Sequence, residues 1–171
     1  ICGNDPFAVI DTEARRSLHY ADKYKFDFVD LKAPFSPDAY TDAITAAEAA
    51  GYKAVITDSF SHEHAGEGGV LDWQEKELND LVARAKERND NREDWKLRDA
   101  YNQLSWQKPK KAHKRMVDKF LQCRSHLIFC LRAEDKIEFK KDDKGKTVVV
   151  PKETLSGFKG WIPICDKRFL F

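Results

Sequence analysis

Short apolar runs alternate along the chain with longer segments whose apolar residues recur at helical spacing. Apolar runs at 7–10, 53–57 and 127–131 predict buried strands, and alternation over 24–31 predicts another. Two prolines, Pro34 and Pro37, interrupt the pattern after that strand. The chain is therefore expected to begin as strand, strand, helix and strand.

Three segments have the pattern of amphipathic helices. Ser36 is expected to cap the first, which runs through an alanine-rich stretch to Ala50 and ends at Gly51. The second covers 70–87 after a glycine-rich loop. The third opens at Pro109 and presents an apolar face made of Ala112, Met116, Val117 and Phe120. Residues 88–108 are more polar and are expected to be partly helical and partly loop.

Strands that alternate with helices over the first 131 residues predict an α/β fold with a mostly parallel sheet. Two further strands, 137–139 and 147–150, flank Asp142-Asp143-Lys144-Gly145 and predict a C-terminal β-hairpin. The tail at 161–171 is expected to add one more strand. The whole of 1–171 is interpreted as a single domain.

Composition supports a globular domain without identifying a partner. Of the 171 residues, 42% are hydrophobic and 35% charged, and the net charge of +1 provides no general attraction to nucleic acid or membrane. No apolar run approaches the roughly 20 residues that span a bilayer. The spacing of the four cysteines fits neither a zinc pair nor a disulfide framework: Cys2, Cys123, Cys130 and Cys165. A reducing, cytoplasmic setting is expected, in a chain cut from a longer protein at both ends.

Polar residues follow the predicted strands at the point where each strand ends. Ligands of open parallel sheets bind at the carboxyl ends of the strands. Asp58 could hold Mg²⁺ there, since carboxylate oxygens are the ligands that this ion prefers. Glu13 could accept a proton from an attacking water, and Arg132 could stabilise charge on a γ-phosphate. Taken singly, each has an ordinary alternative as a helix cap or a surface residue.

Four segments resemble the phage and prophage family of RecA-like, AAA-type ATP-binding proteins. They are AVIDTEARRSLHYADKY, SPDAYTDAITAAEAAGYKAVITDSFSH, SHLIFCLRAEDKIEF and GWIPICDKRF, in the family's order and over nearly the whole chain. The resemblance implies a three-layer RecA-like domain. It also implies an ATPase that acts in DNA recombination or replication in the cytoplasm of a bacterial host.

The resemblance also implies roles for single residues. Asp58 is similar to the Walker B aspartate that holds Mg²⁺ with ATP, Glu13 to the general base, and Arg132 to the polar sensor. Ser59, Ser61 and His62 lie in the stretch that such proteins use near the phosphates. Homo-oligomers of the family often complete the site with a residue of a neighbouring subunit.

One required motif is absent from the sequence. A P-loop, GxxxxGK(S/T), wraps phosphates with backbone N–H groups and a lysine, and no segment of the chain matches it. Gly145-Lys146-Thr147 is a false match, because Lys140 stands where the first glycine is needed. The family's loop and its strand precede the first predicted strand here. Without them the sheet is expected to be less stable. A catalytically inactive RecA-like module for binding or assembly is therefore the alternative.

Two other patterns allow functional and ordinary interpretations. His62 and His64 could bind a metal, but the segment is expected to be a glycine-flanked loop without a third ligand. Lys111, Lys114 and Arg115 share one side of the helix from Pro109 and could contact DNA phosphates. Such a basic side is more often a solvated face. Three aromatic residues could stack on bases or pack in the core: Trp95, Tyr101 and Trp106.

Overall fold

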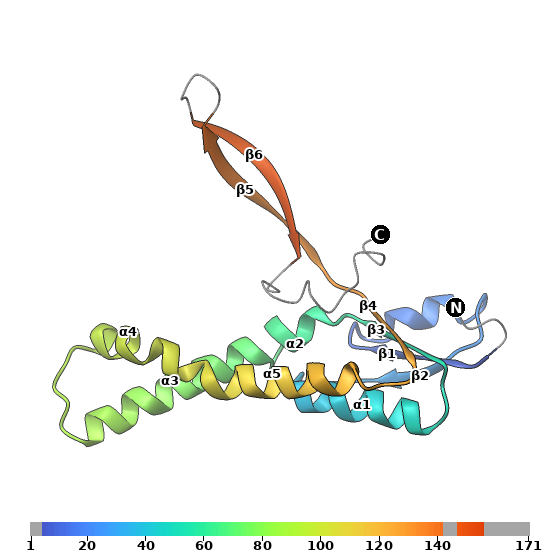
Figure 1. Ribbon diagram of the computed structural model, residues 1–171, viewed down its shortest axis with the longest axis horizontal. Coiled ribbons are helices and arrows are strands. Elements are labelled where there is room, and N and C mark those ends of the chain that lie inside the picture. Colours follow the sequence, from blue (N-terminus) through green and yellow to red (C-terminus); the bar gives the residue numbers. More distant parts are fainter. Residues whose placement is uncertain (1–4, 142–146, 156–171) are drawn as a thin grey trace.

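The computed structural model describes residues 5–141 and 147–155 (Figure 1). Its elements are, in order, β1 (Phe7–Asp11), the 3-10 helix η1 (Arg16–Tyr20), β2 (Asp27–Asp30), α1 (Pro37–Ala49), β3 (Ala54–Asp58), α2 (Ser61–Ala65), α3 (Val70–Glu87), α4 (Asp94–Ser105), α5 (Gln107–Phe120), β4 (His126–Phe129), β5 (Ala133–Lys141) and β6 (Thr147–Leu155). None of the described helices combines the length and apolar character needed to cross a membrane.

A four-stranded, fully parallel sheet forms the centre of the fold, in the order β2-β1-β3-β4. The predicted α/β class with a parallel sheet is confirmed. In the pairing register Asp11 of β1 lies opposite both Asp30 of β2 and Asp58 of β3. The carboxyl ends of these three strands therefore meet at one edge of the sheet.

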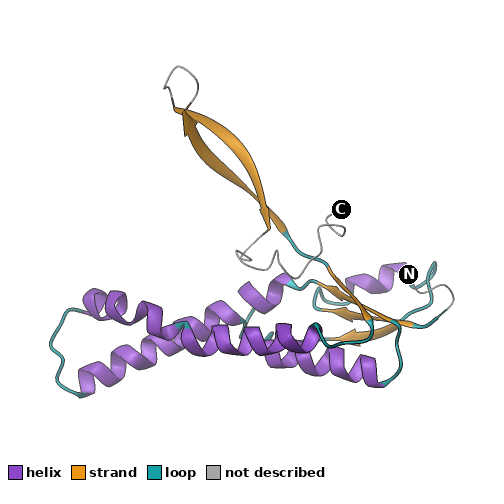
Figure 2. Cartoon of the chain, in the orientation of Figure 1, coloured by secondary structure: helices purple, strands orange, loops and turns teal. Residues whose placement is uncertain are grey.

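One face of the sheet packs on α1 and α5, which lie side by side beneath it (Figure 2). Alternate strand residues point toward these helices, as the pleat of a strand requires. The buried core joins β1 and β3 to both helices and to the residue before α2: Ala8, Ile10, Val55, Tyr40, Ile44, Ala47, Met116, Phe120 and Phe60. The Phe60 ring packs between Tyr40 and Phe129, with ring centroids 5.1 Å and 4.6 Å away.

The opposite face of the sheet carries a shallower cover. Val9 and Ile56 point to this side, where η1 and the segment after it supply Tyr20 and Tyr24. A pocket of about 350 Å³ remains between them. Parallel sheets are normally covered on both faces. Among the described elements η1 is the only helical one on this face, so the three-layer RecA-like arrangement remains a prediction.

Sequence patterning located most helices correctly. Ser36 caps α1 as expected, its Oγ accepting a hydrogen bond from the N–H of Ala39 at 3.2 Å. Gly51, with φ of 90°, follows the helix in the left-handed conformation that glycine tolerates. The helix predicted over 70–87 has those bounds, and α5 begins two residues before Pro109.

The expectation of a loop at His62–His64 was wrong, because these residues belong to the short helix α2. A helix of five residues is too short to show an apolar period, and the flanking glycines suggested a loop instead. Within the partly helical segment 88–108, α4 occupies Asp94–Ser105 and packs on α3 through Leu97, which is fully buried. These two helices extend away from the sheet (Figure 1).

A separate two-stranded antiparallel sheet follows β4. It consists of β5 and β6, paired from Ala133 opposite Leu155 to Lys141 opposite Thr147. The strands expected at 137–139 and 147–150 fall within these two elements. The expected turn at 142–145 and the strand expected at 161–171 lie outside the described residues.

Candidate functional site

Asp11, at the end of β1, is a structural carboxylate. Its side chain is fully buried and accepts hydrogen bonds from the N–H groups of Glu13, Arg15 and Ser17 at 2.7, 3.2 and 2.7 Å, and from the Ser17 hydroxyl at 2.5 Å. Burial alone would raise the pKa of this carboxyl, but the four donors outweigh it and leave the pKa lowered. Asp11 thus fixes the turn that carries Glu13.

Glu13 lies just beyond β1 and meets two cationic or potentially cationic side chains. The Arg132 guanidinium donates from Nη2 to Glu13 Oε1, and His62 Nε2 lies 3.7 Å from the same oxygen. The Glu13 side chain is only 15% exposed, whereas that of Arg132 is 58% exposed. The second oxygen, Oε2, has no hydrogen bond or ion pair with any described residue. Among the described residues, one carboxylate oxygen is therefore held in place while the other has no partner.

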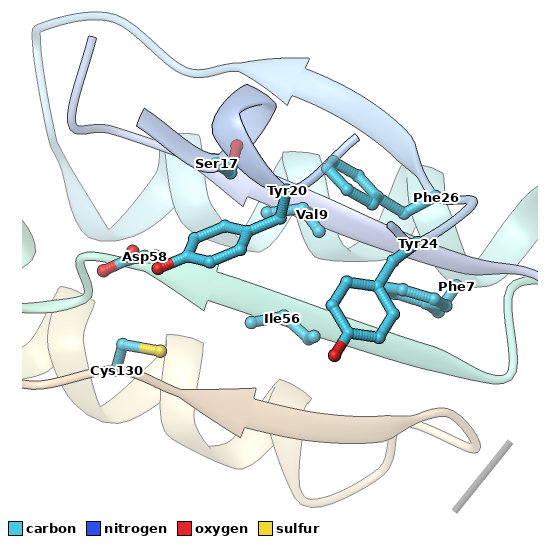
Figure 3. Close-up of a pocket in the computed structure, with 9 residues that line it drawn as sticks. All are labelled: Phe7, Val9, Ser17, Tyr20, Tyr24, Phe26, Ile56, Asp58 and Cys130. Atoms are coloured by element: carbon cyan, nitrogen blue, oxygen red, sulfur yellow. The ribbon is translucent and has the colours of Figure 1, made fainter. Parts of the chain in front are cut away.

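Asp58 ends β3 beside these groups. Burial raises the pKa of its carboxyl, and the negative charge of Glu13 raises it further, while Arg16 and Arg132 act in the opposite direction. The side chain lies at one end of the pocket on the open face of the sheet, near Tyr20 and Cys130 (Figure 3). Asp58 and Glu13 form a pair of interacting carboxylates at the strand ends.

Thr12 connects the three elements around the site, and sequence reasoning did not identify it. Its Oγ1 lies 2.8 Å from His62 Nδ1, accepts from the N–H of Ser59 at 2.8 Å, and lies 2.9 Å from the Ser59 carbonyl oxygen. That carbonyl also accepts from the hydroxyl of Tyr40 at 3.1 Å. The network joins β1, α1 and the start of α2.

The two serines that the sequence analysis assigned to the site, Ser59 and Ser61, are buried beside it. Ser59 is 3% and Ser61 5% exposed, so neither side chain faces solvent. The hydroxyl of Ser61 accepts from the N–H of Arg132 at 2.8 Å and so positions the arginine. The hydroxyl of Ser59 accepts from the N–H of Ser61 at 3.2 Å. Both hydroxyls are bonded within the protein, and the expected place of the two serines near bound phosphates stays a prediction.

A second pair missed in the sequence attaches α2 to α5. Glu63 is fully buried, and its Oε1 lies 2.9 Å from His113 Nδ1. Its Oε2 makes no hydrogen bond with the described residues. A buried carboxylate needs a cationic or hydrogen-bonding partner, which His113 provides. Because α2 also carries His62, this pair holds one wall of the candidate site.

The metal interpretation of His62 and His64 gains no support. The two side chains belong to different surroundings: His62 faces Thr12 and Glu13, whereas the pKa of His64 is lowered by burial and responds to Glu63 and His113. Within the described part of the chain, no three histidine, cysteine, aspartate or glutamate side chains are grouped so that they could hold a metal ion.

The basic residues of α5 form a group of their own. Lys111, Lys114 and Arg115 are exposed, on the side of α5 opposite the buried Met116. Arg115 Nη2 lies 3.9 Å from Asp38 Oδ1, a solvated pair at the limit of an ion pair. Over the described residues, no hydrogen bond or ion pair joins these three to the strand-end site.

Comparison of the chain with protein-family models, with curated proteins and with solved structures finds no match to any of the three. The geometry of the site therefore carries the functional interpretation by itself.

Proposed function

We propose that this chain comes from an ATP-binding and ATP-hydrolysing RecA-like protein of phage origin that acts in DNA recombination or replication, here without its P-loop. The observation that carries the proposal is the meeting of Glu13, Asp58 and Arg132 at the carboxyl edge of one parallel sheet. Each comes from the end of a different strand or just beyond it, where α/β sheets bind their ligands.

The charges of the site fit Mg²⁺ bound together with nucleotide. Burial raises the pKa of Asp58 and the negative charge of Glu13 raises it further, so a cation near Asp58 would relieve the repulsion between the two carboxylates. Asp58 would hold the ion, which would neutralise charge on the outer phosphates. Carboxylate oxygen is the donor type that Mg²⁺ prefers, so the residues fit the group.

Glu13 would act as the general base. Its Oε2 would accept a proton from water as the water oxygen forms a bond to the γ-phosphorus and the bond to the bridging oxygen breaks, which releases ADP and phosphate. Arg132, with its exposed guanidinium, would bind the developing charge on the γ-phosphate. The same guanidinium pairs with Glu13 in the structure.

One observation favours the alternative, a catalytically inactive module for binding or assembly. The 171 residues contain no GxxxxGK(S/T), so the chain by itself offers no cradle of N–H groups for phosphate. The three-layer RecA-like architecture and the C-terminal hairpin of the family are part of the ATPase proposal as well. The β5–β6 pairing and the open face of the sheet are compatible with both.

Calorimetry with Mg²⁺ and ATP separates the two functions. For the 171-residue chain alone we expect no binding tighter than about millimolar, since the phosphate cradle is missing. The protein as its gene encodes it should bind Mg-ATP in the micromolar range. Binding should be lost in Asp58→Asn and retained in Glu87→Asn, a control on the exposed end of α3. Absence of binding by the gene-encoded protein would support the inactive module.

Asp58→Asn should lose nucleotide binding without losing stability. The folded-state pKa of Asp58 is raised, so ionising this group disfavours the folded chain as pH rises through and above the unfolded value of about 3.9. Removing the charge should therefore increase the free energy of unfolding at pH 7 and have little effect at pH 3. Urea unfolding at both pH values measures this, and a destabilised variant at pH 7 would show that Asp58 has a structural role instead.

A further inference from the structure

His62 is held so that each ring nitrogen faces a different partner. Nδ1 lies 2.8 Å from Thr12 Oγ1, and Nε2 lies 3.7 Å from Glu13 Oε1. The ring stacks on Phe35, with centroids 5.0 Å apart and planes inclined by 27°. The side chain is 19% exposed. A flip of the ring about the Cβ–Cγ bond would keep the stacking on Phe35 but lose the Thr12 contact.

Thr12 can satisfy Nδ1 whether or not that nitrogen carries a proton. The Thr12 oxygen already accepts from the N–H of Ser59, and its own proton can be directed either to the Ser59 carbonyl or to His62 Nδ1. When it turns to His62, the Ser59 carbonyl keeps the hydroxyl of Tyr40 as a donor. When His62 is charged and Nδ1 becomes a donor, the Thr12 proton returns to Ser59. No buried group loses its partner in either state.

Nε2 faces the Glu13 carboxylate, and this carboxylate determines which tautomer the neutral His62 ring adopts. An unprotonated Nε2 would direct its lone pair at the negatively charged Glu13 Oε1, which is unfavourable. A protonated Nε2 directs the partial positive charge of its N–H at the same oxygen, which is favourable. The distance of 3.7 Å exceeds that of a hydrogen bond, so the preference is electrostatic. In the charged ring Nε2 carries a proton in any case.

We propose that His62 is a positioning residue for Glu13, and that the Thr12 hydroxyl allows this role through its contact with His62 Nδ1. His62 presents an Nε2–H to Oε1 in both charge states, so Oε1 is held by His62 and Arg132 while Oε2 faces the reacting water. This role rests on the proposed function, in which Glu13 is the base. Neither His62 nor Thr12 takes the substrate proton.

Ring tautomers measured by NMR on ¹⁵N-histidine protein test the proposal with the 171-residue chain. The His62 signals are assigned by their loss in His62→Gln, with His19→Gln as an exposed control. In the neutral ring, the Nε2–H tautomer should exceed the Nδ1–H tautomer by more than about tenfold, or about 1.4 kcal/mol. Glu13→Gln should reduce this excess several-fold, and Glu87→Gln should leave it unchanged.

Two Thr12 variants separate the hydroxyl from the side-chain volume. Thr12→Ser keeps the hydroxyl and should keep the wild-type tautomer excess, whereas Thr12→Val should reduce it. Backbone amide spectra verify that each variant is folded. A neutral ring that is mainly Nδ1–H, or an excess unaffected by Glu13→Gln, would overturn the proposal and leave His62 as a packing partner of Phe35. These results do not depend on nucleotide binding, so the two proposals fail separately.

Discussion

Asp11 and Asp58 lie opposite each other in the sheet, yet their pKa values are shifted in opposite directions. Both are removed from water, which raises the pKa of a carboxyl. Asp11 receives four hydrogen bonds that more than compensate, whereas Asp58 has the negative charge of Glu13 beside it. The same residue type at the same level of the sheet therefore has a structural role in one strand and, under the proposed function, a chemical role in the next.

Asp11→Asn should destabilise the fold at neutral pH. An amide cannot accept from all four donors, and unsatisfied buried donors cost about 1–3 kcal/mol. The lowered folded-state pKa makes this contribution present above the unfolded value of about 3.9 and lost as pH falls through the lower, folded one. Urea unfolding of both proteins at pH 7 and pH 2.5 measures it.

Asp42→Asn on the exposed side of α1 is the matched control for this measurement and should change the unfolding free energy by less than about 0.5 kcal/mol. If Asp11→Asn also changed the unfolding free energy by less than about 0.5 kcal/mol at pH 7, the hydrogen bonds around Asp11 would not hold the Glu13 turn.

The strand-end rule located Glu13, Asp58 and Arg132 from the sequence, because residues at the ends of parallel strands meet at one edge. It could not find Thr12 or the Glu63–His113 pair. Thr12 contacts His62 across 50 positions, and His113 contacts Glu63 across another 50. Contacts of that range depend on how α2 and α5 pack, which no local pattern encodes.

At the scale of elements, the short helix α2 joins the site to the helical layer. Glu63 attaches it to α5, Ser61 attaches it to Arg132, and His62 brings it to Glu13. The glycines after it predicted a loop, and Gly69 shows why glycine is needed there: a Cβ would lie 2.6 Å from the Glu63 carbonyl oxygen. The sequence indicated a glycine-rich loop but not the helix that precedes it.

The basic side of α5 could contact DNA phosphates or could be a solvated face, and a double variant separates the two. Lys111→Ala combined with Lys114→Ala should weaken DNA binding and reduce the slope of log K against log salt by about 2, one for each lost phosphate contact. Fluorescence anisotropy of a labelled single strand and a labelled duplex at several salt concentrations measures both quantities.

Lys23→Ala combined with Lys25→Ala removes the same charge from exposed positions outside α5 and serves as the control. Equal losses in the two double variants would mean that binding follows net charge, and that α5 is a solvated face.

At the scale of the whole molecule, the two faces of the parallel sheet are covered unequally. The sheet face that packs on α1 and α5 is closed by Tyr40, Met116 and Phe120, while the other face keeps a pocket of about 350 Å³. Alternation of strands and helices predicted the parallel sheet. It could not predict which face each helix covers, because that depends on the crossovers and the strand order.

The catalytic assignment of Glu13 is the central claim, and ATP turnover by the protein as its gene encodes it tests the claim most directly. Glu13→Gln keeps the size and the contact with Arg132 but removes the base. It should lower kcat by about 100-fold or more, the usual contribution of general base catalysis, with KM changed little. Glu87→Gln should match the wild type. A Glu13→Gln protein that turns over ATP at the wild-type rate would contradict the claim.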